Sequence, residues 1–513
     1  MDVPLISAKA FGAWIARCEK YFLATLLIWA AAGFLANGRR HFWFDELFTF
    51  HIAQLGDIDR IVKAAPADGQ PPLYYLLAHL AHLVFGPTEL ATRMPSLMAF
   101  VAALIGVYFF VRRRCGALAA LFSVFALDSA FIAHYAWEAR PYALLLAFTA
   151  GALVCWQAAT ERTERRLLPL AGLALCIAGA IASHHFGVLQ VGVPLAAGEA
   201  WRLAKRRRMD VPLWLAGLLG ASMLVATVPL MTATDTSLLE HLRVSTVFYA
   251  RPRVEHLVSY VQMVSPWLVI GFLAATLLAR RFPAPGQNPS LPSPIPGHEV
   301  AAAVALAALL PLVVALCAVT TGAFQLRYAI ATSIGIAIVL GFAVDALERS
   351  TRRAAGVVLF SLMLFGTAWG GTKLAAWRTM APGQTPSVLK AVPAGLPIVV
   401  ASPFVYPTLW WYASPELRER LHYLSDLAFA VRQRDPLPEL TLVTEQSFIP
   451  SKTEAYGAFL AAHREFYLYC RIKQPIPCDD GVTWIKDRLI ADGYVLTVVA
   501  SESDLLMLAT PKK

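Results

Sequence analysis

Long apolar runs separated by short basic clusters constrain this chain more than any other feature. The runs centre near residues 21–37, 90–111, 116–134, 142–159, 167–183, 186–201, 212–231, 257–279, 299–319, 328–347 and 354–372. A helix that crosses a bilayer needs roughly 20 mostly apolar residues, so the runs predict about eleven transmembrane helices. Only 15% of the residues are charged, against roughly 25% in soluble domains. We therefore expect a polytopic α-helical membrane protein.

The positions of the basic residues predict an orientation for these helices. The net charge is +10, and the arginines gather in clusters at 112–114, 162–166, 202–208, 280–281 and 349–353. Each cluster flanks an apolar run, as basic loops do on the cytoplasmic side of a membrane. Nucleic acid is therefore not an expected partner. With a cytoplasmic N-terminus, every cluster falls inside, and an odd number of spans places the C-terminal tail outside. We expect a multi-pass protein of the cell membrane, of the bacterial inner membrane in particular.

The hydropathy falls after about residue 373, which predicts two domains. Residues 1–372 would form the transmembrane domain, and residues 373–513 a soluble, non-cytoplasmic α/β domain. Segments with strand character are PIVVAS at 397–402, YVLTVVAS at 494–501 and LLMLAT at 505–510. Cys470 and Cys478 lie close together in this tail. An oxidising compartment would permit a disulfide between them, but spacing alone leaves the pairing open.

The first predicted outer loop, residues 38–89, is too long for a simple connection between helices, and long loops are often functional. Within it, Asp45 and Glu46 are adjacent and lie between Trp43, Phe44 and Leu47. Apolar surroundings at a membrane interface are a place where the proton affinity of a carboxylate can be tuned. The alternative interpretation is that the two carboxylates only cap an interfacial helix.

Three further outer loops contain polar residues that could act in chemistry. The candidates for substrate binding are His134, Glu138, Arg140 and Tyr142 in the second loop, His184 and His185 in the third, and Arg327 and Tyr328 in a later one. The two arginines could instead bind lipid head groups. The two histidines could be structural, because no spacing typical of metal ligands accompanies them. A divalent cation remains compatible with these residues, and the metal requirement stays open.

At these motifs the sequence resembles a known family. The segments FDE at 44–46, QPPLYYLL at 70–77, EARPYALL at 138–145 and RY at 327–328 are similar to those of integral membrane glycosyltransferases of the GT-C fold. The resemblance is to glycosyltransferase family 39 and its relatives, which include protein O-mannosyltransferases and bacterial aminoarabinose transferases. It covers the membrane part in order. Two departures concern Gln70, where relatives often have His, and the late RY, which lacks a close following Pro.

The resemblance implies transfer of a sugar, usually with inversion, from a polyprenyl-phosphate donor at the non-cytoplasmic face. It implies that Asp45 is the general base, that Glu46 is its catalytic partner and that Arg140 lies near the donor phosphate. Membrane lipids and a glycan, lipid or protein acceptor are the other expected partners. The departures leave the acceptor and the role of Arg327 open. The sugar and the oligomeric state are also open.

The alternative class is a transporter or flippase for a lipid-linked sugar. Such proteins place ionisable residues near the middle of the bilayer, often on interrupted and repeated helices. Asp128 favours this alternative, although we expect it near the outer end of its helix. The other candidates are expected at one membrane face, and no clear internal repeat is present, so the glycosyltransferase is the preferred interpretation.

Overall fold

The computed structural model divides the chain into two compact units, which are described separately. Unit 1 comprises Met1–Gly38, Gln70–Met231 and Pro252–Met380, and unit 2 comprises Arg39–Gly69, Thr232–Arg251 and Ala381–Lys513. The structure describes residues 8–512 except 163, 233–249, 282–294, 321, 352–355, 357–358, 360, 367, 369, 372–385, 391, 394, 434–436, 446–451, 472–477, 479–481 and 503. The expected domain boundary at residues 372 and 373 and part of the last expected span therefore lie outside the described residues.

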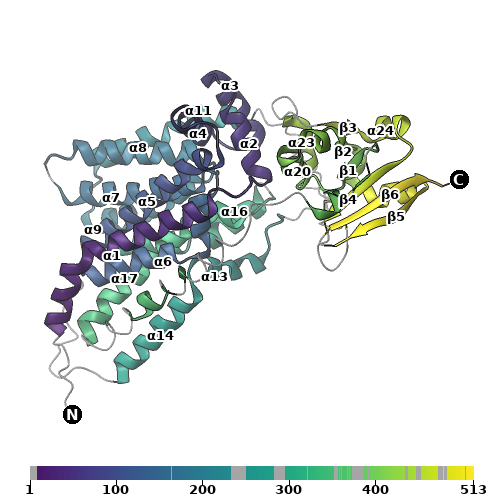
Figure 1. Ribbon diagram of the computed structural model, residues 1–513. Coiled ribbons are helices and arrows are strands. Elements are labelled where there is room, and N and C mark those ends of the chain that lie inside the picture. Colours follow the sequence, from purple (N-terminus) through teal and green to yellow (C-terminus); the bar gives the residue numbers. More distant parts are fainter. Residues whose placement is uncertain are drawn as a thin grey trace, which may run out of the picture. The chain divides into compact units, whose positions relative to one another are not determined.

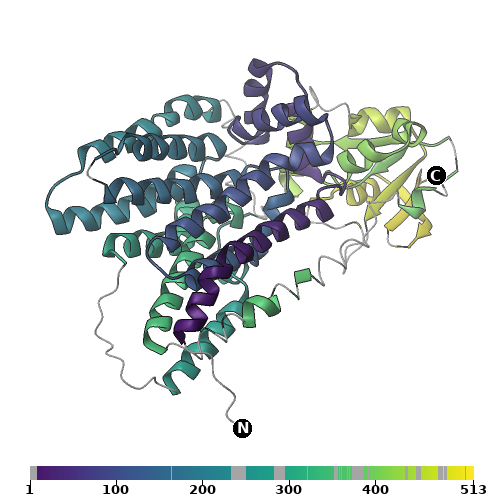
Figure 2. The same ribbon diagram turned by 60° about the vertical axis from the view of Figure 1, so that its left-hand side comes forward.

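Unit 1 is a bundle of helices, many of which lie side by side (Figures 1 and 2). Its longer helices are α1 (Ala8–Asn37), α4 (Leu73–Phe85), α5 (Glu89–Arg112), α6 (Ala117–Asp128), α7 (Tyr142–Glu161), α8 (Leu167–Ser183), α9 (Gly187–Arg206), α10 (Val211–Ala221), α11 (Met223–Thr232), α14 (Pro266–Arg281), α15 (Gly297–Ala307), α16 (Leu309–Val319) and α17 (Thr332–Thr351). Shorter ones are η2 (Phe131–Trp137), η3 (Val254–Ser259), α13 (Tyr260–Met263) and η4 (Leu326–Ala329). These helices follow the apolar runs of the sequence.

Several helices of the structure are long and apolar enough to cross a membrane, and the count of about eleven stays a prediction. Among the described residues, four helices are long and apolar enough, and the number rises to seven if each bent pair forms one span. The bent pairs are α6 with η2, η3–α13 with α14, and α15 with α16, which bend by 74°, 75° and 49°. The sequence predicted spans near 116–134, 257–279 and 299–319 in these places. Pro266 begins the second half of one pair, and proline lacks the N–H that would continue a helix.

Several basic residues of unit 1 form ion pairs near one end of its helices. Arg114, after the end of α5, pairs with Glu299 on α15 at 2.5 Å and with Glu161 at the end of α7 at 2.6 Å. Arg202, near the end of α9, pairs with Asp210 before α10 at 3.0 Å. Helix α7 ends at this network with Glu161, and its opposite end begins at Tyr142. The candidate residue Tyr142 and the basic network thus lie at opposite ends of α7.

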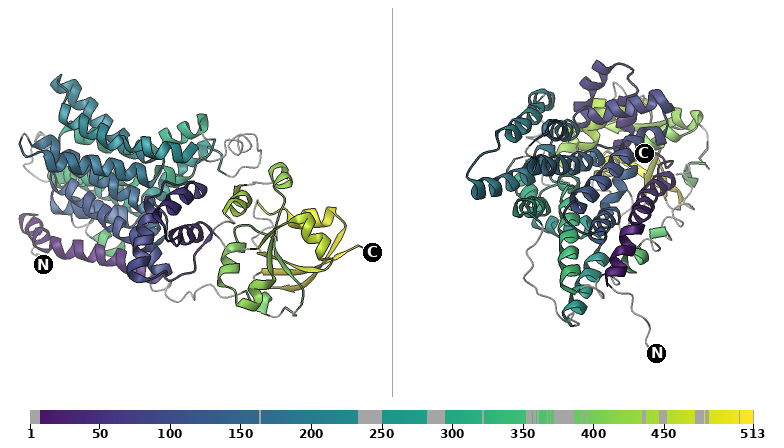
Figure 3. Two further views of the ribbon diagram at one scale, coloured as in Figure 1. Left: turned by 90° about the horizontal axis from the view of Figure 1, so that it is seen from above. Right: turned by 90° about the vertical axis from the view of Figure 1, so that its left-hand side faces the viewer.

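Unit 2 contains a six-stranded mixed sheet flanked by helices (Figures 1 and 3). Its strands are β1 (Ile398–Val400), β2 (Leu421–Ser425), β3 (Thr453–Ala455), β4 (Phe466–Arg471), β5 (Tyr494–Ser501) and β6 (Asp504–Pro511), in the order β3-β2-β1-β4-β6-β5. Strands β1 to β4 are parallel, and β6 pairs antiparallel with β4 and β5. All three residues of β1 are buried, as expected for a central parallel strand. The three segments with strand character thus form β1, β5 and β6.

The flanking helices of unit 2 include α20 (Tyr406–Tyr412), α21 (Pro415–Arg420), α22 (Leu427–Gln433), α23 (Leu437–Glu445), α24 (Tyr456–Ala462) and α25 (Ile485–Ala491), with the short α19 at Ser387–Lys390. Cys470 on β4 forms a disulfide with Cys478, which answers the question left open by the sequence. Unit 2 also contains residues 39–69 of the first long loop, with α2 (Phe44–Ala53), α3 (Ile58–Ala64) and η1 (Ala65–Asp68).

Candidate active site

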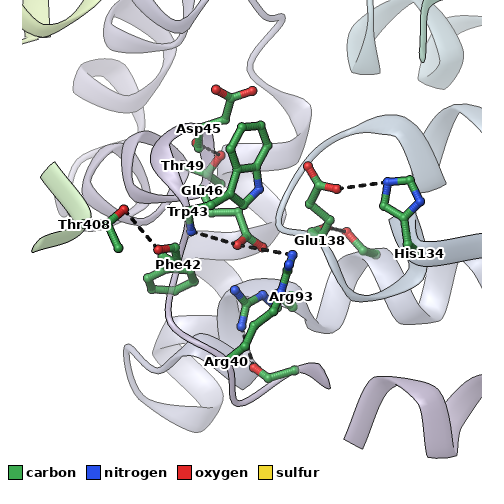
Figure 4. Close-up of polar contacts among 12 residues, drawn as sticks. Arg40, Phe42, Trp43, Asp45, Glu46, Thr49, Arg93, His134, Glu138 and Thr408 are labelled. Atoms are coloured by element: carbon green, nitrogen blue, oxygen red, sulfur yellow. Dashed lines mark hydrogen bonds and ion pairs between the residues drawn. The ribbon is translucent and has the colours of Figure 1, made fainter. Parts of the chain in front are cut away.

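Helix α2 of unit 2 leaves one side chain accessible, and that side chain is Asp45. The nine other residues of this ten-residue helix are buried. Asp45 stands in the first turn, where a negative charge interacts favourably with the helix dipole. Its carboxylate is directed away from that of Glu46 (Figure 4). The other side chains of α2 are therefore used for packing, and the Asp45 carboxylate is the one that is accessible to a substrate.

Glu46 makes contacts that stabilise the start of α2. The backbone N–H of Trp43 donates to Oε2 of Glu46 at 3.3 Å, and the Arg40 guanidinium lies 3.6 Å from the same oxygen (Figure 4). The Glu46 side chain is fully buried, while Arg40 is 43% exposed. The capping contact satisfies a backbone donor that has no partner within the helix. Glu46 thus makes the capping contact that the alternative interpretation of the sequence predicted.

Aromatic residues of α20 hold the segment that leads into α2. The backbone N–H of Phe42 donates to the Tyr412 hydroxyl at 2.9 Å. The Thr408 hydroxyl donates to the Phe42 carbonyl at 3.3 Å (Figure 4). His41 stacks on Tyr412 with ring centroids 3.6 Å apart. On the other side of the helix, Phe44 belongs to the same hydrophobic core as the sheet. The position of Asp45 is therefore fixed by the C-terminal part of the chain.

In unit 1, a hydrogen bond to its backbone holds the turn from Glu138 to Arg140 in place. The Ser96 hydroxyl on α5 donates to the Glu138 carbonyl at 2.6 Å, and Tyr74 on α4 contacts the same hydroxyl at 2.7 Å. The Arg140 side chain is 3% exposed. A guanidinium held this deep suits recognition of an anion, since it offers planar, bidentate donors with little loss of freedom.

His184 lies at the centre of an aromatic and cationic cluster in unit 1. Its ring is 5.6 Å from that of Tyr142 and 5.6 Å from that of Tyr328, and Arg327 lies 5.4 Å above the Tyr142 ring. Burial lowers the pKa of His184 well below its usual range, and the positive neighbours His185, Arg327 and Arg140 add to this effect. The ring is therefore neutral at physiological pH.

The hydrogen bonds of His184 define the free end of its ring. The backbone N–H of Phe186 donates to Nδ1 at 3.1 Å, so the proton of the neutral ring is on Nε2. Among the described residues, this Nε2 has no hydrogen-bond partner, although the side chain is only 1% exposed. A buried donor without a partner is costly and is typical of a site that a ligand completes.

The turn that presents Arg327 is fixed by Gln190, a residue that the sequence analysis did not single out. The Gln190 side chain donates to the Tyr328 carbonyl at 2.8 Å and accepts from the Ala331 N–H at 2.7 Å. It is fully buried on α9. The signal in the sequence was a glutamine within an otherwise apolar run, because polar residues in such runs are rare and often functional.

Unit 1 brings together most of the residues that were predicted for it. Arg140, Tyr142, His184, His185, Arg327 and Tyr328 form one cluster through ring contacts and electrostatic interactions. His134 instead pairs with Glu138, with Nε2 and Oε2 3.5 Å apart (Figure 4). Asp45 and Glu46 belong to unit 2. Within the described part of the chain, no group of three or more His, Cys, Asp or Glu side chains is arranged to hold a metal ion.

Arg93 is another buried residue that sequence reasoning missed. It is fully buried on α5 and donates to the Gly38 carbonyl at 2.7 Å (Figure 4). Gly38 is the last residue of unit 1 before the loop that carries α2. The available signal was an arginine five residues into an apolar helix, where a charge is expensive unless it has a role.

Comparison with known proteins shows what this chain is similar to. Residues 69–232 match the family model of the dolichyl-phosphate-mannose-protein mannosyltransferases, which bears out the resemblance to glycosyltransferase family 39 over this part of the chain. The fold is that of the GT-C membrane glycosyltransferases, and the predicted resemblance is confirmed. None of the curated protein sequences gives a significant match to the chain.

Two solved glycosyltransferases illustrate the similarity. ArnT from Cupriavidus metallidurans, solved in the apo state and bound to undecaprenyl phosphate, is 15% identical with a TM-score of 0.56. The alignment covers 97% of this chain and 98% of ArnT. The oligosaccharyltransferase AglB from Archaeoglobus fulgidus, in complex with an inhibitory peptide and a dolichol-phosphate, is 11% identical with a TM-score of 0.50. That alignment covers 89% of this chain and 70% of AglB.

Proposed function

We propose that this chain is an inverting glycosyltransferase that moves a sugar from a polyprenyl-phosphate donor to an acceptor of the cell envelope. The observation that carries the proposal is the cluster in unit 1, where Arg140 and Arg327 accompany a neutral, buried His184 with an unsatisfied N–H donor. Guanidinium and N–H groups in a buried setting favour a phosphate. The acceptor is a glycolipid, a polysaccharide or a protein.

The reaction is a single displacement at the anomeric carbon. The acceptor oxygen forms a bond to that carbon while the bond to the phosphate oxygen breaks, so the configuration inverts. Asp45 takes the proton of the acceptor hydroxyl, a contribution of typically 10²–10⁴ in rate. Glu46 is its catalytic partner and keeps α2 in place through its contacts with Trp43 and Arg40. The polyprenyl phosphate leaves with increased negative charge, which Arg140 and Arg327 stabilise.

The other residues of the unit 1 cluster orient the donor. His184 donates from Nε2 to an oxygen of the donor, and Tyr142 and Tyr328 form aromatic walls on either side of the imidazole. His185 adds positive potential when protonated. His134 and Glu138 form a pair beside the Arg140 turn and contact the sugar. Support comes from the ligands in two similar structures, undecaprenyl phosphate in ArnT and dolichol-phosphate in AglB.

The orientation in the membrane is part of the proposal. The Arg114 and Arg202 network faces the cytoplasm, as the positive-inside rule predicts, and the opposite end of α7 and the whole of unit 2 face outward. A compartment-sensitive reporter fused after residue 380 tests this assignment. Reporter activity outside is expected, and activity in the cytoplasm would reverse the active face.

The proposal is tested by donor binding and sugar transfer with purified protein in lipid. Arg140→Ala and Arg327→Ala should each weaken binding of a polyprenyl-phosphate sugar and lower turnover, because a phosphate contact acts in the ground state and strengthens as charge develops. Arg253→Ala is the matched control, since Arg253 is an exposed arginine of unit 1. Unchanged binding and transfer by both cluster variants would remove the cluster from the donor site.

The alternative is a transporter or flippase for a lipid-linked sugar, and the three bent helix pairs favour it, because transporters bind substrate at interrupted helices. The two functions differ in their product. A transferase converts the donor into polyprenyl phosphate in a closed assay with acceptor, whereas a flippase moves the intact donor between leaflets. Movement without any release of polyprenyl phosphate would establish the alternative.

A further inference from the structure

Unit 1 contains an apolar cavity whose lining residues are different from those of the cationic cluster. It has a volume of about 350 Å³ and lies among α1, α6, η2, α14 and the residues Leu362, Phe365, Gly366 and Gly370. Volumes of roughly 300–1,000 Å³ are typical of small-molecule sites. Trp267 and Phe365 line the cavity and are each 65% exposed, so the cavity reaches the surface of the unit. No lysine, arginine or histidine is among its lining residues in the described part of the chain.

Glycines make room for the aromatic walls of this cavity. A Cβ at Gly33 on α1 would lie 2.9 Å from the Trp137 ring, and a Cβ at Gly370 would lie 2.5 Å from the Trp29 ring. Distances this short do not occur between real atoms without rearrangement, so each glycine lets an indole pack against the backbone. The two indoles therefore form walls whose position depends on the glycines.

Asp128 is the one charged residue among those that line the cavity. It ends α6, and within the described residues its carboxylate has no hydrogen-bond or ion-pair partner. A carboxylate in an apolar environment is unfavourable unless a positive or hydrogen-bonding group accompanies it. The cavity thus combines a negative charge that lacks a partner with three indoles, Trp29, Trp137 and Trp267.

This combination selects for one chemical class of ligand. Indole faces attract cations, ammonium groups in particular, and a carboxylate adds a full opposite charge. The remaining lining side chains are mostly apolar, with Asn37, Ser129 and Ser265 as the other polar ones. The cavity reaches the surface of a membrane protein, where hydrocarbon chains are the solvent. A phosphate without an amine would be repelled by Asp128, and the walls offer no basic side chain to receive it.

We propose that the cavity binds a membrane lipid with an ammonium head group. The ammonium lies against Asp128 and the indoles, and a hydrocarbon chain of the same lipid fills the apolar part. The proposal concerns a site beyond the sugar-transfer cluster and is independent of the donor. It commits to a resident bilayer lipid as the occupant.

Native mass spectrometry tests the proposal on the full-length protein. The protein is reconstituted in bilayers with equal amounts of phosphatidylethanolamine and phosphatidylglycerol, mildly delipidated, and its retained lipids are identified. The wild type should retain phosphatidylethanolamine over phosphatidylglycerol by at least roughly tenfold. Asp128→Asn preserves the shape of the side chain and should reduce this ratio to near one. Asp59→Asn is the control, since Asp59 is an exposed acid of α3 in unit 2.

A second variant distinguishes loss of lipid binding from a folding defect. Ser129→Trp places a large side chain at an exposed position that lines the cavity and leaves Asp128 in place. It should lower the amount of retained lipid while the protein keeps its thermal stability. Equal retention of the two lipids by the wild type, or an unchanged preference in Asp128→Asn, would overturn the proposal.

Discussion

The backbone N–H of Phe42 donates to the hydroxyl of Tyr412 at 2.9 Å, and the two residues are 370 positions apart in the sequence. This bond connects the segment before Asp45 to α20 of the C-terminal part. It shows that unit 2 contains both the sheet and the helix of the candidate base. The C-terminal part therefore positions the carboxylate, a role that its sequence did not reveal.

Tyr412→Phe should lower the turnover number of sugar transfer by roughly tenfold to a hundredfold, because small displacements of a catalytic group reduce rate strongly. The Michaelis constant for the donor should change little, since the donor cluster is in unit 1. Steady-state kinetics with varied donor measure both constants. Tyr494→Phe, on the edge strand β5, is the control. A change in the Michaelis constant with an unchanged turnover number would contradict a positioning role.

Glu46→Ala should reduce thermal stability by about 1 kcal/mol through loss of the contact with the Trp43 N–H. Glu46→Gln keeps an oxygen that can accept this bond and should be closer to the wild type. Calorimetric or fluorescence unfolding in the same lipid compares the two. If the Gln and Ala variants were equally destabilised, charge pairing with Arg40 rather than capping would be the main contribution.

Stability should depend on pH through His51. Burial lowers the pKa of His51 from its usual value of 6.5 to about 4. The unfolded chain therefore binds a proton below pH 6.5 that the folded chain does not, and stability falls as pH decreases from 6.5 towards 4. The effect should be about 2 kcal/mol between pH 7 and pH 5. His51→Leu should flatten this part of the pH profile of the melting temperature, and an equally steep profile would contradict the assignment.

Glu299→Ala should destabilise unit 1 by about 1.5–3 kcal/mol, because Arg114 loses the hydrogen bonds to its fully buried partner and keeps only Glu161. Gln157 also donates to Glu299, at 2.9 Å, so a second bond is lost. Glu161→Ala is the control, since Glu161 is 30% exposed and contributes at most about 1 kcal/mol. Equal melting temperatures for the two variants would contradict a structural role for the buried pair.

The sequence predicted the elements whose signals are local. Apolar runs located the helices of unit 1, and the β-branched residues of 397–402 located the central strand β1. It did not predict the bends, because a break such as the one at Ser129 and Ala130 leaves hydropathy unchanged. The sequence also did not predict the packing of α2 against α20, since no local pattern links Phe42 with Tyr412. The residues of the unit 1 cluster were found individually, but the unsatisfied Nε2 of His184 appeared only in three dimensions.

Sugar transfer by Asp45→Asn tests the central claim most directly. Asn preserves the size of the side chain and its hydrogen-bonding capacity but cannot accept the proton of the acceptor. The assay measures transfer of a radiolabelled sugar from a polyprenyl-phosphate donor by purified protein in lipid, with donor binding and thermal unfolding as controls and Asp59→Asn as the matched variant. Transfer should fall by at least about 10² while donor binding and the melting temperature remain those of the wild type. Near-normal transfer by the Asn variant would contradict the assignment of Asp45 as the base.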